Sequence, residues 1–151
     1  MAILDWLTSP RGLALDRHLV RYTGHSLLTH VFPRQAGIEP NPALLLRTQG
    51  RKTGLWRDVV LPWFGESNAR VVVGSNGGQA ADPGWVQNLR EHPEAEVFVD
   101  RCLQLVVGRF AEGEEYEALW QSICAHTPVY ADYQRNCKDS RQIPLVVLEP
   151  R

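Results

Sequence analysis

Short apolar runs of strand-like length recur through the last two-thirds of the chain. They occupy residues 43–48, 58–64, 70–75, 95–100, 103–110 and 143–149. The first two runs are joined by the turn-forming stretch 48–57, and the fourth and fifth by Asp100 and Arg101, so each pair predicts an antiparallel hairpin. Because hairpins rather than helices join these strands, the pattern predicts an antiparallel sheet or barrel and not a doubly wound parallel sheet.

Helical periodicity appears in three segments. Residues 13–31 form an amphipathic pattern with a break at Gly24, and the turn-rich connector 34–42 follows. Residues 82–93 predict a second helix, with Asp82 as its N-cap, Pro83 at its first position and Pro93 at its end. The third helix, 114–126, carries a continuous apolar stripe made of Tyr116, Leu119, Trp120, Ile123 and Cys124.

These elements predict a mainly β fold with α-helices: a small antiparallel barrel of about six strands, with an N-terminal helix and two or three outer helices. At 151 residues the chain fits one domain, 1–151. Within it, residues 1–42 form the N-terminal helix and connector, and residues 43–151 form the barrel.

Composition narrows the class of protein. The chain is 44% hydrophobic and 22% charged, as is usual for a globular domain. No apolar run approaches the roughly 18 residues of a membrane-spanning helix, and Asp5 interrupts the short apolar N-terminus, so no secretory signal is indicated. Three cysteines without a CxxC pair argue against a disulfide framework or a zinc site. We therefore expect a cytoplasmic protein, with peripheral membrane contact through the N-terminal helix as a less favoured alternative to a docked helix or lid.

Charge is unevenly distributed. Residues 1–57 carry eight Lys or Arg and three Asp or Glu, whereas residues 58–151 carry eight and fourteen. This asymmetry favours an anionic partner held at one place rather than a nucleic acid bound across one face. The alternative, that the asymmetry disappears when the chain folds, remains equally open.

The segment "GRKTG" concentrates these cations. It differs from a phosphate-binding Walker loop, because Arg51 rather than glycine precedes Lys52. Flanking glycines nevertheless allow backbone N–H groups to converge, and Arg51 and Lys52, with Arg57 across the turn, can hold a phosphate or carboxylate. A merely charged hairpin tip is the alternative interpretation.

A second glycine-marked turn, "VVVGSNGG", ends a strand of the buried type. Ser75 and Asn76 are followed by Gly77 and Gly78, which permit positive φ or a close backbone approach. The N-terminus of the predicted helix 82–93 follows at once and adds free N–H groups. Two donor-rich turns together favour a shared anionic cofactor, although this one also suits a simple strand–turn–helix junction.

Candidate catalytic groups are fewer. Tyr130 and Tyr133 lie three residues apart, so on a helix they share a face from which phenols could stack on a ring or donate to a substrate; packing in the core is the commoner role. Ser75 does not stand in the Gly-x-Ser-x-Gly pattern of a hydrolase elbow, because Val73 occupies the first glycine position. The five histidines show no metal-ligand spacing, so we predict no metal site.

Taken in order, "LLLRTQGRKTGLWRDVVLPW", "VVVGSNGG", "DPGWVQNLREHPEAEVFV", "YADYQ" and "IPLVVLEP" resemble the deazaflavin-dependent nitroreductase family from about Leu44 to the C-terminus. The resemblance implies a split β-barrel that uses the deazaflavin coenzyme F(420). It implies that the loop holds the phosphate and acidic tail of the coenzyme, with the residues Gly50, Arg51, Lys52, Thr53, Gly54 and Arg57. It also implies that the second turn and its helix wrap the ring and its side chain, with the residues Ser75, Asn76, Gly77, Gly78, Trp85 and Asn88.

By the same resemblance, Tyr130 and Tyr133 are candidates to line the substrate side, Ser75 is a further catalytic candidate, and the activity is hydride transfer to a small electron acceptor such as a quinone, nitroaromatic or activated alkene. Ser75 or a tyrosine would hydrogen-bond the acceptor oxygen. The helix tryptophan is followed by Val86, where the family usually has tyrosine, and Leu55 and Trp56 follow the loop. Two alternatives therefore stay open: an FMN-binding split-barrel oxidoreductase, and a non-catalytic carrier of a flavin, tetrapyrrole or lipid. The oligomeric state is not indicated.

Overall fold

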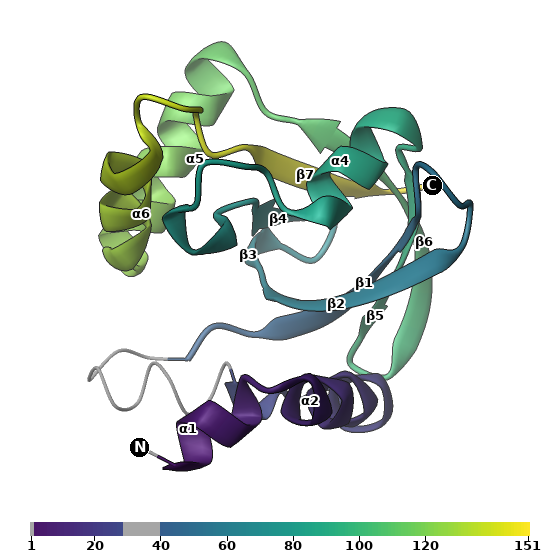
Figure 1. Ribbon diagram of the computed structural model, residues 1–151. Coiled ribbons are helices and arrows are strands. Elements are labelled where there is room, and N and C mark those ends of the chain that lie inside the picture. The colour runs from purple at the N-terminus through teal and green to yellow at the C-terminus, as the bar shows by residue number, and fades with distance from the viewer. Residues whose placement is uncertain (1, 29–39) are drawn as a thin grey trace.

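The computed structural model describes residues 2–28 and 40–151, and shows one antiparallel sheet of seven strands (Figure 1). The strands are ordered β2-β1-β5-β6-β7-β4-β3. Their bounds are β1 Ala43–Gln49, β2 Trp56–Pro62, β3 Phe64–Glu66, β4 Ala69–Val73, β5 Glu94–Val99, β6 Cys102–Phe110 and β7 Leu145–Pro150. The sheet curls until β2, at one edge, contacts β4 near the other. This arrangement confirms the predicted mainly β split barrel.

Both predicted hairpins are present. β1 pairs with β2 in antiparallel register from Ala43↔Pro62 to Gln49↔Trp56, with the glycine-flanked loop at the tip. β5 and β6 turn at Asp100 and Arg101, whose φ angles of 49° and 66° match a two-residue primed turn. Short loops thus fix the register of four of the strands.

The predicted strand 58–64 is wrong in one respect, because it divides into two strands. β2 ends at Pro62, and the N–H of Trp63 then donates to the carbonyl of Pro42. From Phe64 onward the chain pairs with β4 instead of β1. Since proline cannot donate to a strand ladder, Pro62 is a natural place for this change of partner, which accounts for the seventh strand.

The described helices are α1 (Ala2–Leu7), α2 (Pro10–Thr23), α4 (Gly84–Glu91), α5 (Gly113–His126) and α6 (Val129–Cys137), with the short 3₁₀ turn η1 at Asn76–Gly78. The expected break at Gly24 is confirmed, because this residue ends α2 with a φ of 75°. The other parts of the predicted helix and connector that fall at 29–39 lie outside the described residues.

The predicted N-cap of α4 is wrong. Pro83 holds the N-cap position and Gly84 begins the helix, so no side chain caps this end. The Asp82 carboxylate lies one position too early to reach the N–H groups of the first turn. It pairs instead with the guanidinium groups of Arg90, at 3.2 Å, and Arg141, at 2.8 Å.

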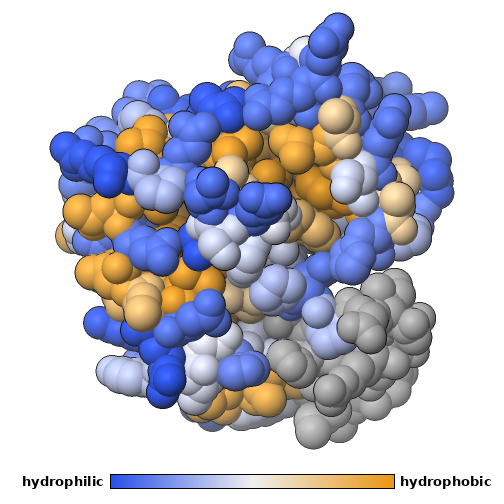
Figure 2. All heavy atoms as spheres, turned by 180° about the vertical axis from the view of Figure 1, so that it is seen from behind, coloured by the Kyte–Doolittle hydropathy of each residue, from blue (hydrophilic) through white to orange (hydrophobic). Residues whose placement is uncertain are grey.

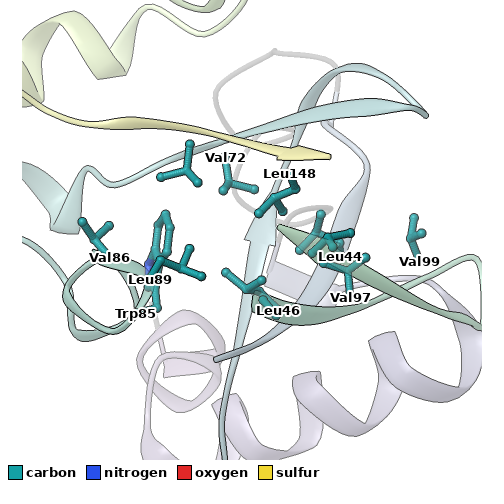
Figure 3. Packing of buried hydrophobic residues seen from close by; sticks show 12 residues of the cluster. Leu44, Leu46, Val72, Trp85, Val86, Leu89, Val97, Val99 and Leu148 are labelled. Carbon is teal, nitrogen blue, oxygen red and sulfur yellow. The ribbon is translucent and has the colours of Figure 1, made fainter. Parts of the chain in front are cut away.

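The sheet carries a buried cluster on each face. On β4, the side chain of Val72 joins one cluster, and those of Val71 and Val73 join the other, as strand alternation requires. In the first cluster, α4 lays its apolar face over the strands inside the curl of the sheet (Figure 3). Its labelled members are Leu44, Leu46, Val72, Trp85, Val86, Leu89, Val97, Val99 and Leu148. The second cluster packs α5 and α6 against the outer face of β4 and β7.

Some large apolar side chains remain at the surface. On the face drawn in Figure 2, hydrophobic side chains form separate orange patches divided by polar side chains. Over the described ranges, the most exposed are Trp6, Leu13, Leu15, Tyr22, Leu27, Leu55, Trp56, Leu103, Leu105 and Val129. No helix among those same residues is long and apolar enough to cross a bilayer.

We expect Leu46→Ala to lower the free energy of unfolding by about 2–5 kcal/mol, because Leu46 is fully buried beneath α4 and its truncation leaves a cavity. Denaturant unfolding followed by circular dichroism measures this change. The matched control is Leu105→Ala on β6, whose side chain is 53% exposed and should cost less than about 0.5 kcal/mol. Equal effects of the two substitutions would contradict the assigned core.

Candidate functional site

The tip of the β1–β2 hairpin presents cations that no described carboxylate neutralises. The N–H of Gly50 donates to the carbonyl of Leu55 at 2.8 Å. Inside this turn, the N–H of Gly54 donates to the carbonyl of Gly50 at 2.7 Å. Arg51, Lys52 and Arg57 are exposed, and none of them enters an ion pair with any residue in the described ranges. These three charges are therefore available to an anionic ligand.

The direction of Arg57 follows from strand register. Arg57 pairs across the hairpin with Thr48, and directly opposed residues project their side chains on the same face of a sheet. Thr48 is fully buried against α4, so Arg57 also lies on the α4 side of the hairpin. The loop cations and Arg57 can thus face one ligand.

A buried amide fastens this hairpin to α4. The Nδ2 of Asn88 donates to the Thr48 hydroxyl at 3.0 Å, and its Oδ1 accepts the backbone N–H of Arg51 at 3.1 Å. Asn88 is only 6% exposed. The side chain predicted to wrap a cofactor is therefore already engaged at both ends, and it positions the cationic loop.

The Ser75–Gly78 turn has an unusual backbone. Ser75 is in the right-handed helical region, and the next three residues, Asn76, Gly77 and Gly78, have φ angles of 46°, 62° and 78°. Asn76 is one of the few non-glycine types that tolerate this region. Its side-chain Nδ2 donates to the carbonyl of Ala81 at 3.0 Å and so closes the loop on itself.

Close packing explains the second glycine of this turn. A Cβ atom on Gly78 would lie 3.0 Å from the Cα and the carbonyl oxygen of Tyr133 on α6. Only glycine allows the turn to approach α6 this closely. The turn is thereby placed directly beside one of the two predicted catalytic tyrosines.

The two tyrosines occupy different depths. Tyr130 is 7% exposed and lies in the second buried cluster, where its ring meets Phe64 edge to face at 5.9 Å. Burial raises the pKa of Tyr130 above its ordinary value, so its phenol stays protonated at neutral pH. Tyr133 is half-buried, with its ring 6.1 Å from that of Tyr130. Of the two, Tyr133 lies beside the turn.

Helix α4 brings the two loops together. It begins at Gly84, directly after the Ser75–Gly78 turn and its short exit, and one turn later Asn88 binds the hairpin. Its eight residues span about 12 Å. Trp85 is 8% exposed and packs in the first buried cluster beneath this arrangement. Trp85 is thus a buried support of α4, whereas Tyr130 belongs to the other buried cluster, on the opposite face of the sheet.

Sequence reasoning missed two residues, Arg141 and Thr48. The guanidinium of Arg141 donates to backbone carbonyls of the Gly74–Gln79 segment, although Arg141 follows α6 in the chain. Thr48 supplies the hydroxyl that Asn88 binds. Neither belongs to a local motif, since each partner is at least 40 residues away in the chain. Within the described ranges, no group of three or more His, Cys, Asp or Glu side chains is placed to hold a metal ion.

Comparison with known proteins places this site in context. Residues 29–150 match the family model described as F(420)H(2)-dependent quinone reductase. The chain is 33% identical over 156 residues to a Mycobacterium tuberculosis (strain H37Rv) protein named F(420)H(2)-dependent quinone reductase, and all of both chains is covered.

Two solved structures are similar to this chain. One, described as an F(420)-H(2) dependent reductase, has 32% sequence identity and a TM-score of 0.63, with 72% of this chain and 94% of that chain covered. Another, described as a domain-swapped dimer, has 28% identity and a TM-score of 0.64, with 97% and 98% covered.

We expect Asn88→Ala to release the cationic loop, because both Thr48 and the N–H of Arg51 lose their partner. The free energy of unfolding should fall by about 1–3 kcal/mol, as for other buried hydrogen bonds. Amide exchange at Arg51 should also quicken, which hydrogen–deuterium exchange measures. Glu91→Ala, at an exposed position of the same helix, is the control and should leave both quantities nearly unchanged. Unaltered exchange at Arg51 in Asn88→Ala would refute this role.

Proposed function

The chain belongs to the F(420)H(2)-dependent quinone reductase family, an oxidoreductase family that uses coenzyme F(420), and from this premise we propose that it reduces a quinone with the reduced coenzyme. The observation that carries the proposal is the set of unpaired cations on the hairpin tip, fixed in place by α4. A phosphate and an acidic tail require several such charges. We treat residues 1–151 as one domain, in which α2 packs against β1, β2 and β5.

The residues present fit this coenzyme. Arg51, Lys52 and Arg57 would hold its anionic groups, while Gly50, Thr53 and Gly54 shape the loop around them. The Ser75–Gly78 turn would face the ring, and α4 would lie between the two contacts, with Trp85 and Asn88 acting as support rather than as direct ligands. When bound, the coenzyme supplies the hydride.

The role of the protein is then to orient the acceptor and to manage charge. A quinone oxygen gains negative charge as the ring is reduced, and nearby hydrogen-bond donors stabilise that charge. We assign this role to the hydroxyl of Ser75 and the phenol of Tyr133. Tyr130, kept protonated by its burial, supports Tyr133 at ring-contact distance. Nitroaromatics and activated alkenes would be served by the same donors.

Two other functions use the same barrel. An FMN enzyme would need fewer cations, because FMN has a single phosphate and no acidic tail. A non-catalytic carrier of a flavin, tetrapyrrole or lipid would need no donors at the reacting end. The three hairpin cations that pair with no described carboxylate favour the deazaflavin over both.

We expect the double substitution Arg51→Ala with Lys52→Ala to weaken binding of coenzyme F(420) at least tenfold, because each cation contributes charge-assisted hydrogen bonds worth about 1.5–3 kcal/mol. Titration of the purified protein, followed by quenching of tryptophan fluorescence, measures the dissociation constant. FMN is titrated in parallel, and its affinity should change less.

The control for this double substitution is Arg101→Ala, which removes a cation from the tip of the other hairpin. It should leave the affinity within twofold of the wild type. An unchanged affinity in the double variant would remove the loop from the binding site, and a wild-type preference for FMN would favour the flavin alternative.

Peripheral membrane contact is a further proposal for the N-terminal helices. Trp6 and Tyr22 are 47% and 68% exposed, and Arg11, Arg17 and Arg21 belong to the same region. Apolar side chains beside basic ones favour an anionic lipid surface. We expect Trp6→Ser with Tyr22→Ser to reduce cosedimentation with anionic phospholipid vesicles about tenfold, relative to a Leu105→Ser control. Equal sedimentation of both variants would contradict this contact.

A further inference from the structure

A single guanidinium group binds the backbone carbonyls of the Gly74–Gln79 segment. Arg141 donates to the backbone carbonyls of Gly74 at 3.0 Å, Ser75 at 2.7 Å and Gln79 at 3.0 Å. It also pairs with the Asp82 carboxylate at 2.8 Å. The Arg141 side chain is only 10% exposed, so water competes little for these bonds. Four acceptors around one buried cation make a rigid centre.

This contact determines which way the turn presents its polar groups. In a trans peptide the carbonyl and the N–H point in opposite directions. Because Arg141 holds the carbonyls of Gly74 and Ser75, the N–H groups of Ser75 and Asn76 point away from it. No described residue accepts a hydrogen bond from these two N–H groups, or from that of Gly77.

The backbone of the turn supports the same conclusion. A residue in the right-handed helical region followed by one with positive φ makes successive N–H groups converge, which is a known geometry for binding anionic oxygens. Ser75, with φ −70° and ψ −33°, and Asn76, with φ 46°, follow this sequence. Asparagine tolerates the positive φ that this geometry requires at position 76.

Arg141 also connects the turn to the helices around it. It pairs with Asp82, which precedes α4 by two positions. Asp82 also pairs with Arg90 on that helix. On the other side, Gly78 packs against the backbone of Tyr133 on α6. Arg141 thus links the turn to the start of α4, and the packing of Gly78 links the same turn to α6.

We propose that Arg141 is a positioning residue that holds the Ser75–Gly77 N–H groups toward a negatively charged oxygen of the bound ligand. The inference rests on the proposed function and names a residue outside the expected site. That oxygen belongs either to the deazaflavin ring or to the acceptor as it is reduced. Both are negatively charged oxygens, and the experiment below distinguishes them.

The test compares wild type with Arg141→Ala, Arg141→Lys and Arg109→Ala. Arg109 is a matched control, because it too donates several charge-assisted hydrogen bonds, to the carboxylates of Glu115 and Glu149, but its side chain is 44% exposed on another surface. Binding of oxidised coenzyme F(420) is titrated without acceptor. The steady-state rate of menadione reduction by the reduced coenzyme is then measured as a function of menadione concentration. Thermal unfolding of each variant shows that it is folded under the assay conditions.

If the turn serves the coenzyme, Arg141→Ala weakens F(420) binding at least tenfold. If it serves the acceptor, F(420) affinity stays within twofold and kcat/KM for menadione falls at least tenfold. In either case, added guanidinium ion at low millimolar concentration restores part of the loss, Arg141→Lys lies between Ala and wild type, and Arg109→Ala matches wild type.

Wild-type values of both F(420) affinity and kcat/KM in a folded Arg141→Ala protein would overturn the inference. So would an equal loss in Arg109→Ala, which would indicate a general effect of removing a cation. If Arg141→Ala does not fold, Arg141→Lys decides, and wild-type values in that variant overturn the inference. Failure of the wild-type protein to bind F(420) is a different result, because it removes the proposed function itself.

Discussion

The buried amide of Asn88 links the tip of the first hairpin to α4 by two hydrogen bonds, and the geometry of the candidate site depends on this contact. The hairpin tip would otherwise be an exposed loop carrying like charges, which repel one another. By accepting the N–H of Arg51 and binding the hydroxyl of Thr48, Asn88 gives the loop a fixed position without neutralising its cations. The protein thereby pays the ordering entropy on folding rather than on binding.

A second fixed point lies at the other end of the same helix. There Asp82 and Arg141 form a pair that is mostly buried, and the guanidinium extends from this pair to three carbonyls. Because removing either partner of such a pair would leave an uncompensated charge, the arrangement is strongly constrained. With both ends of α4 anchored, the cationic loop and the donor-rich turn keep a constant separation, which suits one elongated ligand better than two independent ones.

Local signals explain how much of this could be predicted from sequence. The hairpins, the break at Gly24 and the apolar stripe of α5 depend on residues close together in the chain, and all three predictions are confirmed. The division of the second strand, the N-cap of α4 and the role of Arg141 depend on contacts made only in three dimensions. Asp82 is a residue type that favours the N-cap position, but the mostly buried guanidinium of Arg141, 59 residues away in the chain, binds its carboxylate instead. No periodicity along the chain carries that information.

The uneven charge of the sequence acquires its meaning in the same way. The described cations of the first 57 residues have different surroundings once the chain has folded. Arg47 pairs with Asp58 and Glu96, and Arg21 stacks over the ring of Phe98. The cations at the hairpin tip, by contrast, have no carboxylate partner in the described structure. A binding site for an anion is therefore indicated by which cations folding leaves unpaired, and the total charge of a segment is a poor substitute for that observation.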